Sequence, residues 1–323
     1  MIDFDALDRL ARNIEQHAFR RGYVSAFTLA AFPVPTESEL VLHITRECDG
    51  LVYGNAEVGT TDAFKACIEA LDGRVDYVVC DTEMPFFVTP PDQHGVERTR
   101  KSIMLPYRDL DVWVSSVRFT LSALVSGIES MQAVVVGSGS QHEPLGYKLA
   151  IDLEGYFNDV RVVGVADDEA EEDVLDGADV IIGAAIYKQV ITVDHITRTR
   201  KSPLLVDAGI GTLTPEAAQY AREHGLRMIR VDNRAAMAGT LFSLIQSHDL
   251  VTRVMGEGEI DGVPVVAGGI VGPPGTVIVD SIANPAQVIG IADGTGKVRY
   301  SPENEEERER LRRVTKALER GDE

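Results

Sequence analysis

Five short apolar runs alternate with helical patterns in the second half of the chain, and this alternation constrains the fold more than any other feature. The runs are almost continuously apolar, as in strands buried on both faces, while the segments between them carry apolar residues at helical spacing. The pattern predicts an α/β fold with a doubly wound, Rossmann-like parallel sheet and right-handed crossovers. The expected strands are 132–136, 160–165, 180–183, 204–206 and 227–231, and the expected helices are 145–157, 215–224 and 234–255.

The rest of the chain has a different order of elements. A first helix, strands at 23–31, 39–44, 51–53 and 75–80, a capped helix at 62–71 and a short helix at 118–127 are expected before the Rossmann-like region. After residue 256, short β runs with Asp-Gly turns indicate hairpins, and Glu alternates with Arg in a final helix. We expect an α/β substrate-binding domain at 1–126, a dinucleotide-binding domain at 127–255 and a β-rich segment with a charged helix at 256–323.

Composition narrows the class of partner. The 31 basic and 51 acidic residues give a net charge of −20, which repels nucleic acid and anionic membrane surfaces. No run approaches the roughly 18 apolar residues that span a membrane. Three cysteines and seven dispersed histidines lack metal-site spacing, so we expect no metal and a reduced, cytoplasmic protein. A small-molecule substrate, with no nucleic acid and no membrane, is the expected partner.

The strand at 132–136 runs into a glycine-containing segment and then a helical pattern, the order of a phosphate-binding loop. Gly146 follows Gly139 by seven residues, unlike the usual G-x-G-x-x-G spacing, so a simple glycine-rich turn is the alternative. His142 can donate a hydrogen bond to a phosphate, or can be an exposed loop residue. The cofactor-binding candidates in this segment are Gly137, Ser138, Gly139, Ser140, His142 and Gly146.

Further cofactor candidates follow the next three strands. Asp167 comes just after the second strand, where a carboxylate accepts hydrogen bonds from the ribose hydroxyls of NAD and repels the 2′-phosphate of NADP. NAD or NADP is the expected cofactor, with NAD favoured; an acidic loop is the alternative. Ala184, Ala185 and Gly209 follow the third and fourth strands, where small residues admit a ring and ribose, or only permit close packing.

Five residues of the first half could orient or protonate a substrate. We assign catalytic roles to Lys65 and Glu83 and substrate binding to Asp81 and Asp109, on condition that a cleft brings them to the glycine loop. Asp111 is the fifth. The alternatives are a surface lysine for Lys65 and a capped loop for Asp81 and Glu83.

Four segments in sequence order resemble the cofactor domain of the bifunctional methylenetetrahydrofolate dehydrogenase/cyclohydrolase family: 137–140, 178–183, 205–210 and 267–274. The stretch 108–112 is similar to that family's Lys-Asp-Val-Asp-Gly. The resemblance extends to tetrahydromethanopterin-linked dehydrogenases. It implies hydride transfer between NAD(P) and a small or pterin-type substrate in an interdomain cleft, a catalytic Asp111 that contacts the pterin-like ring, Gly269 in the substrate site, and a homodimer.

The sequence also departs from that family. Its Tyr-x-x-x-Lys pair is absent, Lys65 is offset from the catalytic lysine, and residues 82–85 replace its Gln-Leu-Pro-Leu-Pro. A non-redox cyclohydrolase or lyase of the same fold, or a catalytically silent nucleotide-binding protein, is therefore the alternative function.

Overall fold

The computed structural model describes residues 4–32, 38–83, 101–137, 144–164 and 174–321. The chain forms two compact units, Met1–Leu241 and Phe242–Glu323. The domain boundaries expected at 126 and 255 remain predictions. None of the helices in the described ranges combines the length and the apolar composition that crossing a bilayer requires.

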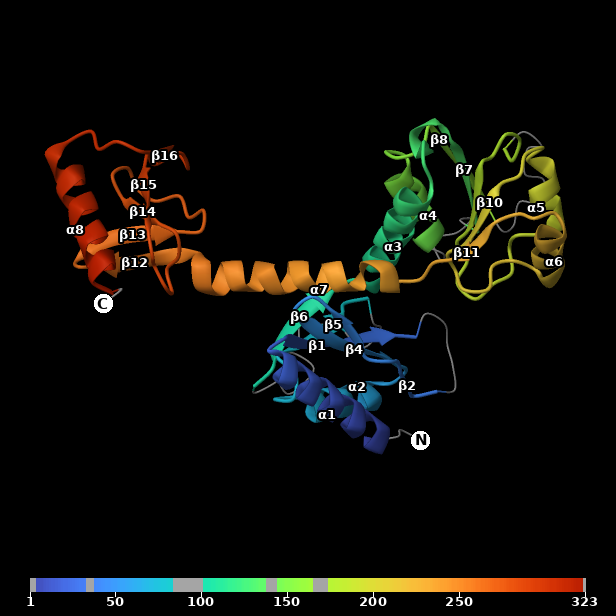
Figure 1. Cartoon of the computed structure of the whole chain (residues 1–323), viewed down its shortest axis with the longest axis horizontal. Helices are drawn as coiled ribbons and strands as arrows, with labels where there is room; N and C mark the ends of the chain where they lie inside the picture. The colour runs from blue at the N-terminus through green and yellow to red at the C-terminus, as the bar shows by residue number, and fades with distance from the viewer. Residues whose placement is uncertain (1–3, 33–37, 84–100, 138–143, 165–173, 322–323) are drawn as a thin grey trace. The chain divides into compact units, whose positions relative to one another are not determined.

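The first unit begins with a six-stranded sheet whose strand order is β2-β4-β1-β5-β6, with β3 also paired to β4. The strands β1, β4, β5 and β6 are parallel, and β2 and β3 run antiparallel to β4. Helices α1 and α2 lie side by side on one face and bury an apolar core against it (Figure 1). The bounds are α1 (Phe4–Arg21), β1 (Val24–Ala31), β2 (Leu40–Leu42), β3 (Arg46–Cys48), β4 (Leu51–Val58), α2 (Thr61–Leu71), β5 (Tyr77–Asp81) and β6 (Ile103–Tyr107).

Two expected elements of this region are longer than predicted, and the strands β3 and β6 have no counterpart among the expected elements. The strand expected at 51–53 continues to Val58, because β4 pairs with β1 along its whole length, from Val24↔Leu51 to Ala31↔Val58. Gly54 lies inside that strand, where a Cβ would come within 2.6 Å of the Ile14 side chain of α1. The helix expected at 118–127 is α3 (Asp109–Leu124), which begins nine residues earlier. Local periodicity does not reveal either change, since pairing and packing decide both.

The predicted Rossmann-like sheet is confirmed. Five parallel strands have the order β11-β10-β9-β7-β8. Core clusters lie on both faces, one including α3 and α4 and the other α5 and α6. The chain reverses its direction of winding between β7 and β9, the switch point at which sheets of this kind bind ligands. The bounds are β7 (Gln132–Val136), α4 (Pro144–Leu153), β8 (Asp159–Val163), β9 (Val180–Gly183), α5 (Val193–Arg198), β10 (Leu204–Asp207), α6 (Pro215–Glu223), β11 (Met228–Arg230) and α7 (Arg234–Asp249), which continues across the unit boundary.

The second unit is a five-stranded sheet in sequence order, covered by α8 (Figure 1). The expected β run 259–263 is the turn of a hairpin, since Asp261 and Gly262 adopt positive φ angles of 49° and 71° between β12 and β13. The apolar stripe of the charged helix, Leu311, Val314 and Leu318, packs on this sheet. The bounds are β12 (Gly256–Ile260), β13 (Val263–Ala267), β14 (Val277–Val279), β15 (Val288–Ala292), β16 (Val298–Arg299) and α8 (Glu305–Gly321).

Candidate functional site

Three strand-end loops of the Rossmann-like sheet meet at Ala185. Gly137 follows β7 directly and has a φ of +110°, and a Cβ there would lie 2.9 Å from the Ala185 nitrogen. A Cβ on Gly209 would lie 2.4 Å from the Ala185 carbonyl oxygen, and the Tyr187 N–H donates to the Gly209 carbonyl at 2.7 Å. Only residues without side chains fit at Gly137 and Gly209. The predicted candidates Gly137, Ala184, Ala185 and Gly209 are therefore together at the switch point.

The remaining cofactor candidates either lie outside the described residues or belong to helix α4. Ser138, Gly139, Ser140, His142 and Asp167 lie outside the described residues. Gly146 is buried within α4 and does not belong to the loop. The contacts of Gly137 and Gly209 are contacts with the chain itself, so close packing, the alternative considered from the sequence, accounts for these glycines whether or not a cofactor binds.

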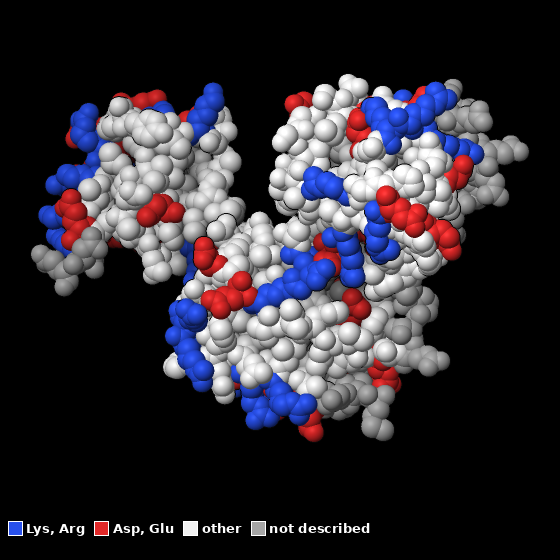
Figure 2. Space-filling view, turned by 45° about the vertical axis from the view of Figure 1, so that its right-hand side comes forward, with Lys and Arg blue, Asp and Glu red and all other residues white. Residues whose placement is uncertain are grey.

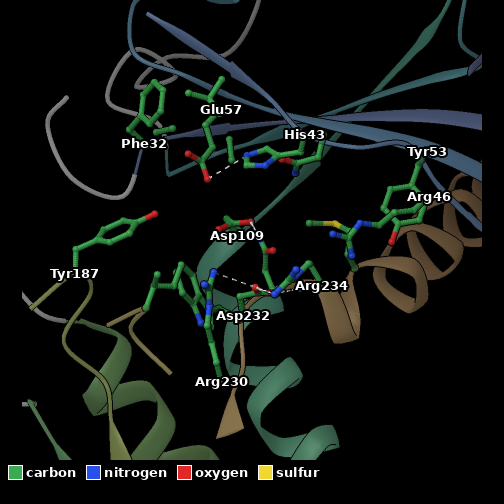
Figure 3. A pocket seen from close by; sticks show the side chains of 18 of the residues that line it. Phe32, His43, Arg46, Tyr53, Glu57, Asp109, Tyr187, Arg230, Asp232 and Arg234 are labelled. Atoms are coloured by element: carbon green, nitrogen blue, oxygen red, sulfur yellow. Dashed lines mark hydrogen bonds and ion pairs between the residues drawn. The ribbon is translucent and has the colours of Figure 1, made fainter. Parts of the chain in front are cut away.

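A cavity of about 460 Å³ lies next to this point, at the carboxyl edges of both sheets in the first unit (Figure 3). Its size is typical of small-molecule sites. One wall comes from β1, β3, β4 and the segment around β2, and the other from α3, the start of α7 and the loops after β9, β10 and β11. Its charged and hydrogen-bonding side chains are Ser38, His43, Arg46, Tyr53, Asn55, Glu57, Asp109, Trp113, Tyr187, Arg230, Asp232, Asn233 and Arg234.

Asp109, a predicted substrate-binding residue, is the carboxylate that enters this cavity from the start of α3. Its Oδ1 accepts hydrogen bonds from the Tyr107 hydroxyl at 3.2 Å and from Asn233 Nδ2 at 2.8 Å. Burial raises the pKa of Asp109 to about 6, with a further rise from Asp81, while the Asn233 and Tyr107 hydrogen bonds oppose the shift. Asp109 therefore exchanges a proton near neutral pH, as acid–base catalysis requires.

Asp81 supports Asp109 from the end of β5. It is buried, and its Oδ1 accepts the backbone N–H of Asp109 at 3.2 Å and that of Glu83 at 3.0 Å. Burial raises the pKa of Asp81. Asp81 does not line the cavity; it holds the backbone of two other candidates in place.

Glu83 and Asp111 belong to a separate charged cluster. Arg108 donates to Glu83 Oε1 at 2.7 Å, and Lys148 Nζ donates to Asp111 Oδ1 at 2.7 Å and lies 3.8 Å from Glu83 Oε1. Lys148 comes from α4, the helix that follows the glycine loop. Lys65, in contrast, lies on the exposed face of α2 and does not line the cavity.

Sequence reasoning missed Lys148 and most of the cavity. Lys148 had a local signal, its position four residues into the helix after the glycine loop, but nothing in the sequence relates it to Glu83 and Asp111. Gly269, the other predicted substrate-binding residue, is an exposed glycine with a φ of +85° in the second unit. Within the described ranges, no three His, Cys, Asp or Glu side chains gather as a metal site.

No protein-family model matches the chain, and neither does any curated protein sequence. Among solved structures, the chain is similar to the N5,N10-methylenetetrahydrofolate dehydrogenase-cyclohydrolase of Trypanosoma brucei, complexed with NADP cofactor and inhibitor, at 15% identity and a TM-score of 0.39, over 76% of this chain and 95% of that chain. It is also similar to L-tryptophan dehydrogenase from Nostoc punctiforme, at 15% identity and a TM-score of 0.37, over 70% and 74% of the two chains.

A third solved structure has comparable similarity. A putative aspartate carbamoyltransferase of Leishmania major Friedlin matches at 10% identity and a TM-score of 0.33, over 67% of this chain and 84% of that chain. All three likenesses are distant. The α/β fold described above rests on the chain's own strand order.

Proposed function

We propose that the chain is an NAD(P)-dependent oxidoreductase that transfers a hydride to or from a small molecule bound in the cavity beside the switch point. A pterin-type substrate, a homodimer and a cytoplasmic location, each expected from the sequence or its resemblance, are part of this proposal. The cofactor would extend along the strand-end loops at Gly137, Ala185 and Gly209.

One observation carries the proposal. The loops after β9 and β10 border both the glycine-containing switch point and the cavity. Ala185 contacts Gly137 and Gly209, while Tyr187, two residues further on, lines the cavity. Gly209 is followed directly by Ile210, which also lines the cavity. A dinucleotide on these loops would have one end beside the substrate pocket, as hydride transfer at van der Waals contact requires.

The chain's own residues have separable roles in such a reaction. When bound, the nicotinamide ring would supply the hydride acceptor or donor. Asp109 would hold or release a proton at its carboxyl group, with Tyr107, Asn233 and the Asp81-anchored backbone fixing its position. Lys148, Glu83 and Asp111 would act as positioning residues, because their ion pairs join α4 to α3 and to the end of β5.

Asp109 also favours the alternative function. A carboxyl group with a pKa of about 6, held beside a pocket, can serve a cyclohydrolase or lyase that transfers protons and no hydride. The two functions differ in whether a nicotinamide cofactor binds.

Cofactor binding is our first testable prediction. We expect NAD or NADP to raise the unfolding temperature and to alter the fluorescence of Trp113, the single tryptophan, which lines the cavity. The measurement is a titration with NAD, NADP and their reduced forms. If none of the four binds at millimolar concentration, the oxidoreductase proposal fails.

The same titration tests the predicted preference for NAD. Replacing Asp167 with Ala should weaken NAD binding and relax the discrimination against NADP, because the carboxylate would bond the ribose hydroxyls and repel a 2′-phosphate. Glu129→Ala, in the 3-10 turn Ile128–Ser130, is a control for loss of one acidic charge elsewhere. An unchanged NAD-to-NADP ratio in the Asp167 variant would remove the ribose assignment.

A further inference from the structure

We propose that the substrate of this cavity carries a negatively charged group, a carboxylate or a phosphate, bound by Arg46, Arg230 and Arg234. The inference rests on the proposed function, since it names the substrate class of the same pocket. Neither the glycine loops nor the resemblance to a known family points to these arginines.

Arg46 has unused donors that face the cavity. It lies in β3 opposite Tyr53 of β4, and its guanidinium lowers the pKa of the Tyr53 phenol against the larger, opposite effect of burial. Within the described ranges, no carboxylate lies at ion-pair distance from Arg46. A guanidinium has five N–H donors and no acceptor, so one phenol leaves most of them available to a ligand.

Arg230 and Arg234 share a single carboxylate. Asp232 Oδ2 lies 3.5 Å from the Arg230 guanidinium and also pairs with Arg234, whose backbone N–H donates to Asp232 Oδ1 at 3.1 Å. The Asp232 side chain is only 11% exposed, whereas each arginine side chain is 52% exposed. Asp232 therefore anchors both guanidinium groups at the cavity while neutralising only one charge, and arginine matches the planar geometry of carboxylate and phosphate oxygens.

The acidic side chains of the cavity have partners of their own. Glu57 lies 3.5 Å from His43 Nε2, and Asp109 accepts the Tyr107 and Asn233 hydrogen bonds. Figure 3 shows Glu57 beside His43 and Arg46 beside Tyr53. Among the described residues, neither Glu57 nor Asp109 forms an ion pair with one of the three arginines.

Trp113 provides a reporter for a ligand in this cavity. Its side chain lines the cavity, and the residue is 5% exposed. A ligand bound beside the indole ring would change the environment of the ring and therefore its fluorescence.

The test uses the full-length protein without cofactor and follows Trp113 fluorescence at constant ionic strength. Inorganic phosphate and succinate are the two anionic probes, and glycerol and sodium chloride are the controls. We expect a saturable change with at least one anionic probe and none with the controls. Saturation by phosphate alone assigns a phosphate-bearing substrate, and saturation by succinate alone a carboxylate-bearing one.

Variants connect the signal to the arginines. Arg46→Gln and Arg230→Gln should each weaken binding about tenfold, because each removes a charge-assisted hydrogen bond. Arg20→Gln, at an exposed arginine of α1 outside the cavity, should bind as the wild type does. Circular dichroism checks folding; if Arg46→Gln does not fold, the exposed Arg230 variant decides the outcome.

The proposal is overturned if neither anion gives a saturable signal, or if the folded arginine variants bind both probes as tightly as the wild type. These outcomes are distinct from failure of the oxidoreductase proposal. Anion binding without nicotinamide binding would contradict the redox function and support the anionic ligand. Nicotinamide binding without anion binding would support the redox function and contradict the anionic ligand.

Discussion

At the scale of single residues, Asp109 is hydrogen-bonded to residues of several different elements. It begins α3, its backbone is held by Asp81 from β5, and its carboxylate contacts Tyr107 from β6 and Asn233 from the start of α7. Two of these partners are its neighbours in sequence or sheet, but Asn233 lies 124 residues away. This arrangement keeps a poorly solvated carboxyl group in a fixed position beside the cavity.

The raised pKa of Asp109 predicts a pH dependence of stability. Because the folded protein favours the protonated carboxyl, this contribution to stability is complete below the ordinary pKa of 3.8 and is lost as pH rises through about 6. Relative to Asp109→Asn, the wild type should lose up to about 3 kcal/mol of unfolding free energy between about pH 4 and 7, at 1.36 kcal/mol per pKa unit.

Urea unfolding of both proteins across this pH range measures the difference. Asp111→Asn, two residues along the same helix at an exposed position, controls for removal of a carboxylate near the helix start. Parallel stability curves for wild type and Asp109→Asn would contradict the buried titration. If Asp109 is the proton-transferring group, the same variant should also lower kcat by about 100-fold or more.

At the scale of elements, helix α2 illustrates how a single capping residue stabilises the start of a helix. Thr60 is the N-cap of α2, and its hydroxyl accepts the Ala63 N–H at 3.1 Å. The helix buries Phe64, Ile68 and Leu71 against the six-stranded sheet. The cap therefore stabilises an element that completes the core beneath one wall of the cavity.

Removal of this cap has a defined cost. Thr60→Ala should lower the unfolding free energy by about 1 kcal/mol, since an orphan N–H at the helix start loses its partner. Thr61→Ala, at the neighbouring exposed position inside the helix, is the matched control and should change stability little. Equal losses in the two variants, measured by urea denaturation, would show that the cap contributes nothing specific.

At the scale of the whole molecule, the main feature is the large excess of acidic over basic residues. Basic and acidic side chains are interspersed over the face seen in Figure 2, and the acidic ones do not form a single patch on that face. The net charge of −20 nevertheless produces self-repulsion in the folded state. Ion pairs such as Arg299–Glu307 in the second unit reduce it locally.

Salt should therefore stabilise this protein. Raising sodium chloride from about 0.1 to 1 M shortens the Debye length from about 10 to 3 Å and screens the repulsion between distant carboxylates. We expect unfolding temperatures to rise, as measured by scanning calorimetry, with potassium chloride giving the same result if screening is responsible. A fall with salt would mean that attractive ion pairs outweigh the net repulsion.

Much of the fold could be predicted because its signals are local. The strands β7, β9 and β10 are nearly continuous apolar runs, and the helices of this region carry apolar residues at a 3.6-residue period, so both are visible in short windows of sequence. Elements set by distant partners were not predicted correctly. The length of β4 depends on β1, and the short strand β3 is defined by its pairing with β4.

The amino-acid sequence by itself determined the α/β class, the glycine turn at Gly137 and the small residues at the neighbouring strand ends, because backbone conformation and apolar periodicity act over a few residues. Only the tertiary structure decided which side chains share a cavity. Arg46 and Arg230 are far apart in the sequence of the first unit, and Lys148, not Lys65, pairs with Glu83 and Asp111. No spacing rule relates such residues, since the order of strands in two sheets brings them together.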